Sequence, residues 1–456
     1  MLPHLSLPFL LLSSALSFVP AVKTLSHRVR HPTPAADDAA AVPTVTAYYF
    51  DQLIDHENPS LGTFKQRYFF SDEYWTRQGA PIVLANPGEQ SADGFDDDLT
   101  SPGSLQTALM MSLGAAGVVL EHRYWGESSP YQNLTTANLE YLTLDQSIED
   151  TRVRSVLLHL YFVQHAKLPW TKKAKTSNPE VVPWINIGCS YPGVLSAYTQ
   201  KRYPKLFAAA WASSAPVQAV GDFWQYFEPI EEGMSKNCSK DVGEAITHID
   251  QILLYGSEAE KRKLKKSFGL EKLRDDDFAQ ALVHPIWGWQ NMDPGSYATD
   301  GEDPFFQFCD AIETHPNGKI SKSAKGVGMP TALNNHAKWI KAKEAAGCDG
   351  GGGACYSTYD YTTDKYTDWR VDNHDGDRQW NWMICNEFGF FQGGDPGNYS
   401  VIVSSLVTES YNIRQCNHMF LNADGSLGNF YPDTANVKAE NGGGWNLRAR
   451  NLFVVN

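Results

Sequence analysis

Apolar and polar positions alternate in a regular way between residues 46 and 215. Short apolar runs at 81–85 (PIVLA), 117–121 (GVVLE), 184–187 (WINI) and 207–212 (FAAAWA) predict buried strands, because they are too short for buried helices. Helical spacing separates them at 104–113. Thr143 and Gln146 predict a capping box at the start of a longer helix, whose apolar face would hold Ile148, Val156, Leu160 and Val163. Strands that alternate with helices indicate a mainly parallel sheet covered on both faces.

This alternation is lost after Pro216. Residues 217–440 contain helical stretches at 242–254 and 336–345 without regular strands between them, and the run 452–455 (LFVV) predicts one more buried strand. We therefore expect a core in residues 46–216, a mainly helical insertion in 217–440, and a return to the core in 441–456. The glycine run 350–353 lacks the Lys and Ser/Thr of a phosphate loop, so it predicts a loop clasped by Cys348 and Cys355 rather than a nucleotide site.

Composition narrows the range of partners. The chain has 38 Lys+Arg against 52 Asp+Glu, a net charge of −14, and no basic stripe, which argues against nucleic acid and anionic membrane surfaces as partners. With 42% hydrophobic and 12% aromatic residues, it is a globular protein rather than a disordered one. No spacing of His, Cys, Asp or Glu indicates a metal site, and none indicates an organic cofactor.

The N-terminal segment predicts export. Residues 5–21 form an apolar stretch in which Val19 and Ala21 fit a small-residue cleavage site, so we interpret residues 1–21 as a signal peptide. Residues 22–45 are rich in Pro, Ala and Asp and indicate a linker or removable pro-segment. The apolar stretch is too short to span a membrane, so no membrane insertion is expected. A disordered apolar tail is the alternative, but we favour a secreted protein, or one sent to a vacuole or lysosome.

Cysteines and glycosylation motifs agree with export. Of the seven cysteines, Cys189 falls within an apolar strand and is expected to be a free thiol. The other six could form three disulfides, whose pairing the sequence leaves open. We favour Cys238–Cys309, Cys348–Cys355 and Cys385–Cys416 over a zinc site, because no paired C-x-x-C elements occur. Three motifs would accept N-linked glycans at Asn133, Asn237 and Asn398.

The stretch Gly188-Cys-Ser190-Tyr191-Pro192-Gly193 follows the strand WINI and precedes a helical stretch. A Gly-x-Ser in this context predicts a nucleophile elbow, a tight strand-to-helix turn that lifts the serine hydroxyl above the sheet edge. Gly188 fits because the turn leaves no room for a Cβ atom, whereas Pro192 occupies the position of the usual second glycine. A bare Gly-x-Ser is often only structural, so the prediction depends on the flanking strand and helix.

Two further polar stretches follow strands. The first, residues 121–128 (EHRYWGES), predicts a hydrogen-bonded network in which His122 and Arg123 support a loop rather than act in catalysis. The second, residues 86–89 (NPGE), lies where a serine hydrolase of this design places an oxyanion-hole donor. We therefore predict that the backbone N–H groups of Tyr191 and Gly88 form the oxyanion hole.

The chain resembles one known family in several short motifs. They are EHRYWGES, GCSYPG, the segment ASSAP (212–216), ICNEFGFFQ (384–392), and the late QCNHMF and GGGWN regions. The family is the serine carboxypeptidase family of lysosomal prolyl carboxypeptidase and dipeptidyl peptidase II, and ICNEFGFFQ is most similar to its fungal secreted members. The resemblance implies an α/β-hydrolase core with a helical cap, a Ser–Asp–His triad with Ser190 as the nucleophile, and peptide or protein substrates cleaved next to proline. Family members carry Gly-Gly-Ser-Tyr-Gly-Gly where this chain has Gly-Cys-Ser-Tyr-Pro-Gly.

The same resemblance places the triad Asp and His after a strand like LFVVN, so we expect both, and the C-terminal part of the core, to be missing from this chain, which ends at Asn456. Six histidines follow Ser190 and are weak candidates for a substitute base: His248, His284, His315, His336, His374 and His418. Two alternatives to an active peptidase therefore remain. One is a catalytically inactive fragment or pseudoenzyme, and the other is an esterase or lipase on the same core.

Overall fold

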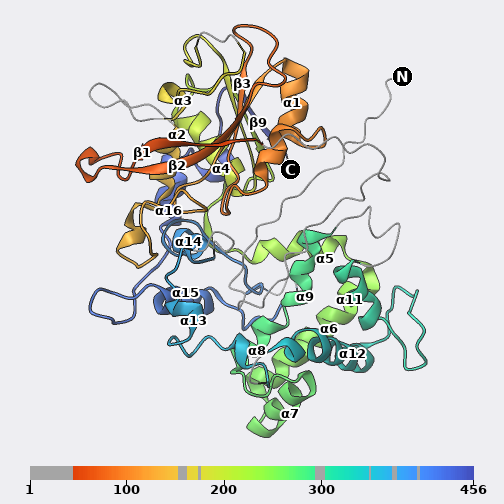
Figure 1. The fold of residues 1–456 in the computed structure, drawn as a ribbon. Helices are drawn as coiled ribbons and strands as arrows, with labels where there is room; N and C mark the ends of the chain where they lie inside the picture. Colours follow the sequence, from red (N-terminus) through yellow and green to blue (C-terminus); the bar gives the residue numbers. More distant parts are fainter. Residues whose placement is uncertain are drawn as a thin grey trace, which may run out of the picture.

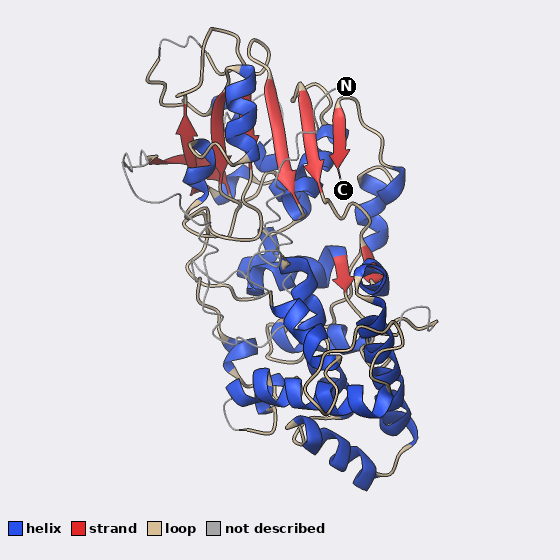
Figure 2. Cartoon of the chain, turned by 90° about the vertical axis from the view of Figure 1, so that its right-hand side faces the viewer, coloured by secondary structure: helices blue, strands red, loops and turns tan. Residues whose placement is uncertain are grey.

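The computed structural model describes residues 45–151, 162–172, 176–292, 303–348, 351–371, 377–397 and 401–455. A seven-stranded sheet lies at one end of the molecule and most of the helices lie at the other (Figures 1 and 2). The spatial order of the strands is β1-β2-β4-β3-β5-β6-β9. Their bounds are β1 Ala47–Leu53, β2 Thr63–Ser71, β3 Ile82–Ala85, β4 Ala116–Leu120, β5 Trp184–Cys189, β6 Ala209–Ser213 and β9 Leu452–Val455. The predicted signal peptide, and all but residue 45 of the predicted linker, lie outside the described residues.

Strands β3, β4, β5, β6 and β9 pair in parallel, while β1 and β2 add an antiparallel edge. The five predicted strands are confirmed as strands, although β6 begins two residues later than the apolar run does, and the prediction that 452–455 is buried is wrong. The inner strands consist of continuous apolar runs because both faces of the sheet are covered there. Ile82 and Val83, which point to opposite faces of β3, are each 0% exposed. At the other edge, β9 carries half-exposed apolar side chains, with Phe453 58% and Val454 51% exposed.

The helices that flank the sheet begin at capping residues. Helix α1 (Leu105–Leu113) starts at Ser104, whose Oγ accepts a hydrogen bond from Thr107 N at 3.0 Å. Helix α2 (Leu144–Thr151) starts after Thr143, whose Oγ1 accepts one from Gln146 N at 3.1 Å. The side chain of Gln146 bonds instead to His56 N and Asp55. The predicted capping box is therefore only half formed.

Two further helices complete the sheet region, α3 (Phe162–His165) and α4 (Tyr191–Arg202). Ile148 and Val163, two members of the apolar face predicted for the helix after Thr143, are buried. Val156 and Leu160 lie outside the described residues.

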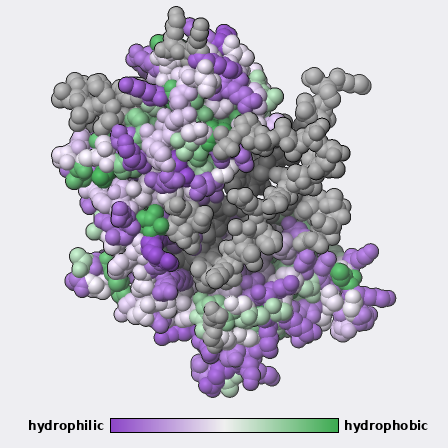
Figure 3. All heavy atoms as spheres, in the orientation of Figure 1, coloured by the Kyte–Doolittle hydropathy of each residue, from purple (hydrophilic) through white to green (hydrophobic). Residues whose placement is uncertain are grey.

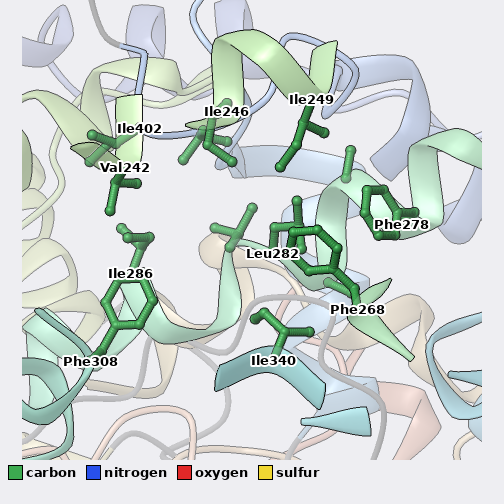
Figure 4. Close-up of a cluster of buried hydrophobic side chains, with 14 of the residues drawn as sticks. Val242, Ile246, Ile249, Phe268, Phe278, Leu282, Ile286, Phe308, Ile340 and Ile402 are labelled. Atoms are coloured by element: carbon green, nitrogen blue, oxygen red, sulfur yellow. The ribbon is translucent and has the colours of Figure 1, made fainter. Parts of the chain in front are cut away.

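The helical region contains its own hydrophobic core (Figure 4). In α6 (Lys236–Tyr255), the buried residues Val242, Ile246, Ile249 and Leu253 recur at helical spacing and face Phe268, Phe278, Ile286, Phe308 and Ile340 of neighbouring helices. Hydrophilic side chains cover the far end of this region in Figure 3. Its helices are α5 Glu228–Gly233, α7 Glu258–Phe268, α8 Asp275–Ala281, α9 His284–Trp287, α11 Pro304–Ile312 and α12 Met329–Lys343.

The later part of the expected insertion packs on the sheet region instead. Helices α13 (Asp364–Thr367), α14 (Asp377–Met383), α15 (Glu409–Met419) and α16 (Thr434–Glu440) contribute to a cluster that also contains Tyr124, Leu195 and Tyr198 of the core. A π-helical turn, Ile384–Phe388, follows α14 and leads into β8 (Gly389–Phe391), which pairs in parallel with β7 (Val220–Asp222). The segment 377–391 thus lies against the core although it is far from it in sequence.

The three favoured disulfides, Cys238–Cys309, Cys348–Cys355 and Cys385–Cys416, are confirmed, and Cys189 is a free thiol. Within the described ranges, none of the helices combines the length and the apolar character that crossing a bilayer requires.

Candidate active site

Ser190 lies at the turn between β5 and α4, at the carboxyl end of a central strand of the sheet. Its backbone has φ 61° and ψ −130°, a left-handed conformation that few residues other than glycine adopt. Ser190 N donates to Ser213 O of β6 at 2.9 Å, and Ser190 O accepts from Val194 N of α4 at 3.1 Å. The serine is therefore held in a strained turn by the strand on one side and the helix on the other, which is the geometry of a nucleophile elbow.

The turn is tight because small residues surround it. A Cβ atom at Gly188 would lie 2.1 Å from Pro192 O, and one at Gly193 would lie 2.9 Å from the Cβ atom of Ala215. The segment 212–216 therefore packs directly behind the elbow, where Ala215 is 5% exposed. Larger side chains at these positions would push the helix away from the strand.

Pro192 replaces the second glycine of the family pattern without distorting the helix. It occupies the first turn of α4, where its missing N–H group would have no intrahelical acceptor. Its ring lies against Gly88, since a Cβ atom there would be 2.5 Å from Pro192 Cγ. The proline is accommodated because residue 88 has no side chain.

The two predicted oxyanion donors lie on either side of Pro192. Tyr191 is the first residue of α4, where backbone N–H groups have no acceptor within the helix. Gly88, with φ +81°, donates its N–H to Asn86 Oδ1 at 2.8 Å, and Asn86 in turn donates to Leu120 O at 2.9 Å. Gly88 could serve an oxyanion only if it exchanged this hydrogen bond, so its role stays a prediction.

The predicted network of the EHRYWGES stretch is confirmed. Glu121 is fully buried, and its carboxylate accepts from Arg67 at 2.5 Å, Ala92 N at 2.8 Å and Ser128 Oγ at 2.6 Å. Arg123 is also fully buried, and its guanidinium pairs with Asp150 of α2. Burial alone would raise the pKa of Asp150, but the charge and hydrogen bonds of Arg123, together with those of His56, outweigh burial and lower it.

His122 connects this network to the elbow. Its Nδ1 lies 2.8 Å from Arg123 O, and its Nε2 lies 2.9 Å from the hydroxyl of Tyr191. A carbonyl can only accept, so Nδ1 carries the proton and Nε2 accepts from Tyr191. Burial lowers the pKa of His122 to about 4, which keeps the imidazole neutral at higher pH.

Aromatic side chains from the segment 377–391 form a wall beside Tyr191. The ring of Tyr191 lies 5.5 Å from Trp380 and 5.7 Å from Phe388. Phe388 stacks on Phe390 at 5.3 Å, and Phe390 lies 6.1 Å from Phe223, which follows β7. We name these five rings the aromatic wall. Phe390 has φ 56°, so the backbone that presents it is strained.

Glu387, in the same π-helical turn, fixes this wall to the core. Its carboxylate accepts from Leu144 N, the first residue of α2, at 2.9 and 3.1 Å. Burial raises the pKa of Glu387 to about 8. The sequence contained no local signal for this contact, because 243 residues separate its partners; only the resemblance of ICNEFGFFQ singled out the segment.

The candidate histidines lie in different places. His284 pairs with Glu344 at 2.8 Å, His336 is buried between Phe268 and Phe308, and His418 bonds to Thr358 O at 3.1 Å. The contacts of His284 and His336 lie within the helical region, whereas His418 belongs to α15, which packs on the sheet region. None of these contacts involves Ser190. His248 lies on α6 and His315 follows α11, while His374 is outside the described residues.

Cys189 immediately precedes Ser190 at the end of β5. Burial raises the pKa of its thiol, so the thiol stays protonated at neutral pH. In the described part of the chain, no group of three or more His, Cys, Asp or Glu side chains is arranged to hold a metal ion.

The sheet order, the left-handed serine between β5 and α4, and the helical insertion define an α/β-hydrolase of the serine type. The sequence model of the family Peptidase S28, "Serine carboxypeptidase S28", matches residues 52–456. The chain belongs to this family of serine peptidases.

Curated relatives agree with this assignment. The chain is 35% identical over 426 residues to "Serine protease vicPa" of Bipolaris victoriae, covering 89% of this chain and 76% of that protein. It is 30% identical over 398 residues to "Probable extracellular serine carboxypeptidase" of Arthroderma benhamiae, covering 82% and 52%. It is 29% identical over 265 residues to "Lysosomal Pro-X carboxypeptidase" of Mus musculus, covering 56% and 50%. The match thus extends over about three quarters of the first protein and about half of the other two.

Proposed function

We propose that this chain is a secreted serine peptidase that cleaves peptide bonds next to proline through an acyl-enzyme at Ser190. The observation that carries the proposal is the backbone of Ser190, a strained left-handed turn between a central strand and α4. Ser190 Oγ would attack the scissile carbonyl carbon and lose its proton to a general base, which then protonates the departing amine. Water would release the acyl group in the second step. We assign the general base to no residue of the described chain.

The oxyanion formed in each step would face the N–H of Tyr191. This group lies at the positive end of α4, so it would stabilise the developing charge. Gly88 is the second proposed donor, after exchange of its bond to Asn86.

The aromatic wall supports the preference for proline. Tyr191, Trp380 and Phe388 are buried, but the wall continues to Phe390 and Phe223, which are partly exposed and would be available to a substrate. A pyrrolidine ring is compact and apolar, so it packs well on aromatic faces and gives up little conformational freedom when bound. One relative is also named for action at Pro-X bonds.

Secretion is supported by the apolar segment 5–21, by three disulfides, and by a relative named as extracellular. The three sequons, at Asn133, Asn237 and Asn398, also agree with export.

The test combines a fluorophosphonate probe, which labels activated serines, with two chromogenic substrates. We expect wild type to form one adduct at Ser190 and to hydrolyse an Xaa-Pro anilide in preference to a p-nitrophenyl ester. Ser190→Ala should abolish both while leaving the unfolding curve unchanged. Ser196→Ala, which removes a buried hydroxyl from the same helix, is the matched control and should label like wild type.

The other outcomes identify the alternatives. A preference for the ester would indicate an esterase or lipase. A folded wild-type chain that forms no adduct would indicate a catalytically inactive protein.

A further inference from the structure

The hydroxyl of Tyr191 has no part in the proposed chemistry, which uses only the backbone N–H of this residue. The side chain is nevertheless fully buried and makes a 2.9 Å hydrogen bond to His122 Nε2. Burying a phenol without a partner costs free energy, so the acceptor at Nε2 allows this ring to lie in the interior.

His122 is itself rigidly held. Its Nδ1–H donates to Arg123 O at 2.8 Å, and its ring packs edge-on against Trp125 with a centroid separation of 4.7 Å. Arg123 is fixed in turn by Asp150 and by the carbonyls of Leu53, Ile54 and Tyr141. The Nε2 atom therefore belongs to a network of groups that are nearly or fully inaccessible to solvent.

Tyr191 is confined on its other side by two neighbouring rings of the aromatic wall, Trp380 and Phe388. Apolar ring contacts restrict the ring but do not set the direction of its hydroxyl, which bonds to His122 Nε2 and also lies beside the side chain of Ser147. The ring and the backbone N–H of Tyr191 are attached to the same Cα atom, and this residue directly follows Ser190 at the start of α4. Anchoring the ring therefore also restrains the backbone that carries the proposed oxyanion donor.

We propose that His122 is a positioning residue for the oxyanion hole: it accepts the Tyr191 hydroxyl hydrogen bond and thereby fixes the Tyr191 backbone N–H beside Ser190. The inference rests on the proposed function of Ser190 and Tyr191. His122 would touch neither substrate nor the reacting atoms, and it must carry its proton on Nδ1 to act in this way.

Burial preserves this state against the neighbouring groups that favour the charged ring. Burial is the main cause that lowers its pKa, and the Arg123 charge lowers it further, while the bond to Arg123 O and the Asp150 charge raise it. The ring is therefore neutral above about pH 4.

The first measurement does not depend on activity. Selective ¹⁵N labelling of histidine gives spectra in which the two neutral tautomers and the charged ring are distinct. We expect His122 to be neutral with its proton on Nδ1 at pH 6, and Tyr191→Phe, which removes only the hydroxyl, to shift the Nε2 resonance. A proton on Nε2, a charged ring at pH 6, or no shift in Tyr191→Phe would overturn the proposal.

The second measurement is the rate of fluorophosphonate labelling at Ser190. Loss of a whole oxyanion donor lowers rates about 10²–10³-fold, so misplacing one should cost less, about 10-fold, with little change in probe affinity. Tyr191→Phe and His122→Phe should each show this loss, and the double variant should lose no more than either one, because both remove the same hydrogen bond.

His336→Phe is the matched control. His336 is also a buried imidazole, 1% exposed, but it lies in the helical region between Phe268 and Phe308 and should leave labelling unchanged. Labelling of wild type, Tyr191→Phe and His122→Phe at equal rates would overturn the positioning role alone. If His122→Phe does not fold, Tyr191→Phe decides. A wild type that does not label would overturn the proposed function, and this inference with it.

Discussion

The ring of Pro192 lies directly on the backbone of Gly88, so that a Cβ atom at residue 88 would be 2.5 Å from Pro192 Cγ. Gly88 lies in the loop after β3, and Pro192 lies in the first turn of α4. Their contact explains how the chain replaces the second glycine of the elbow by proline. It also means that no side chain fits at residue 88, whether or not its backbone N–H contributes to the oxyanion hole.

Gly88→Ala should therefore displace the elbow. The new methyl group would overlap the Pro192 ring, and alanine is also disfavoured at the φ of +81° that Gly88 adopts. We expect a loss of about 1–3 kcal/mol in the free energy of unfolding, measured with urea, and slower labelling at Ser190.

Pro192→Ala in the Gly88→Ala background separates the two causes. It removes the ring atoms that overlap, so it should restore most of the labelling rate and leave only the backbone cost of about 1 kcal/mol. A Gly88→Ala variant as stable and as reactive as wild type would show that Gly88 and Pro192 do not constrain each other.

A second prediction concerns two buried carboxyl groups in the helical region. Glu313 is 2% exposed and lies beside Asp241, which is fully buried and accepts from Val327 N at 2.6 Å. Burial, and next the charge of Asp241, raise the pKa of Glu313 to about 7 from an ordinary 4.5, while Asn237 and Lys240 oppose them. Between about pH 4.5 and pH 7, the folded state therefore keeps a proton on Glu313 that the unfolded state has released.

Stability should consequently fall as pH rises from about 4.5 to about 7, by up to about 3 kcal/mol from this group. Glu313→Gln keeps the shape but cannot ionise, so its unfolding free energy should exceed that of wild type at pH 8 and approach it at pH 4. Urea unfolding at several pH values measures the difference. A variant that differs from wild type equally at both pH values would refute this explanation.

Glu344→Gln provides a control of opposite sign. Burial would raise the pKa of Glu344, but the hydrogen bond and charge of His284, together with the hydrogen bond from Tyr356, outweigh burial and lower the pKa. The pair therefore stabilises the fold above the unfolded pKa and loses this contribution as pH falls. Glu344→Gln should destabilise the protein more at pH 7 than at pH 3.

How far the sequence predicts this fold depends on whether the signal is local. The inner strands were predictable because β-branched and apolar residues fill both faces, as in Ile82 and Val83 of β3. The elbow was predictable because its constraint falls on adjacent residues: Gly188 cannot carry a Cβ atom, and Ser190 must lie where a strand meets a helix.

Other features depend on contacts between distant segments. Gln146 has the spacing of a capping box, but its side chain hydrogen-bonds to Asp55 and to the backbone of His56. At the same helix start, the carboxylate of Glu387 accepts a hydrogen bond from Leu144 N. The positive φ of Phe390 likewise could not be predicted from its residue type, since aromatic residues seldom adopt that conformation. Such features arise from tertiary packing, which the local pattern does not contain.

The three disulfides should contribute to stability in the order of the loops that they close. Sequence separations of 71 for Cys238–Cys309, 31 for Cys385–Cys416 and 7 for Cys348–Cys355 correspond to about 4.4, about 3.7 and about 2.4 kcal/mol in the chain-entropy estimate. Replacing each pair by alanine and measuring thermal unfolding tests the order. If the Cys348–Cys355 pair cost the most, loop closure could not be the main cause.

Glycosylation should discriminate between the two described sequons. Asn133 is exposed in a loop, whereas Asn237 is half-buried in the first turn of α6 beside the fully buried Cys238. The Asn237 amide donates to Ser321 O at 3.3 Å, so attachment of a glycan would require this nitrogen to turn outward. We expect Asn133 to be occupied and Asn237 to be unmodified in protein secreted from a eukaryotic host.

Peptide mass spectrometry after glycosidase treatment in heavy-oxygen water gives the occupancy of each site. Asn133→Gln should remove one glycan from the intact mass, whereas Asn237→Gln should remove none. Full occupancy of Asn237 would mean that the glycan is added before α6 and the Cys238–Cys309 disulfide have formed.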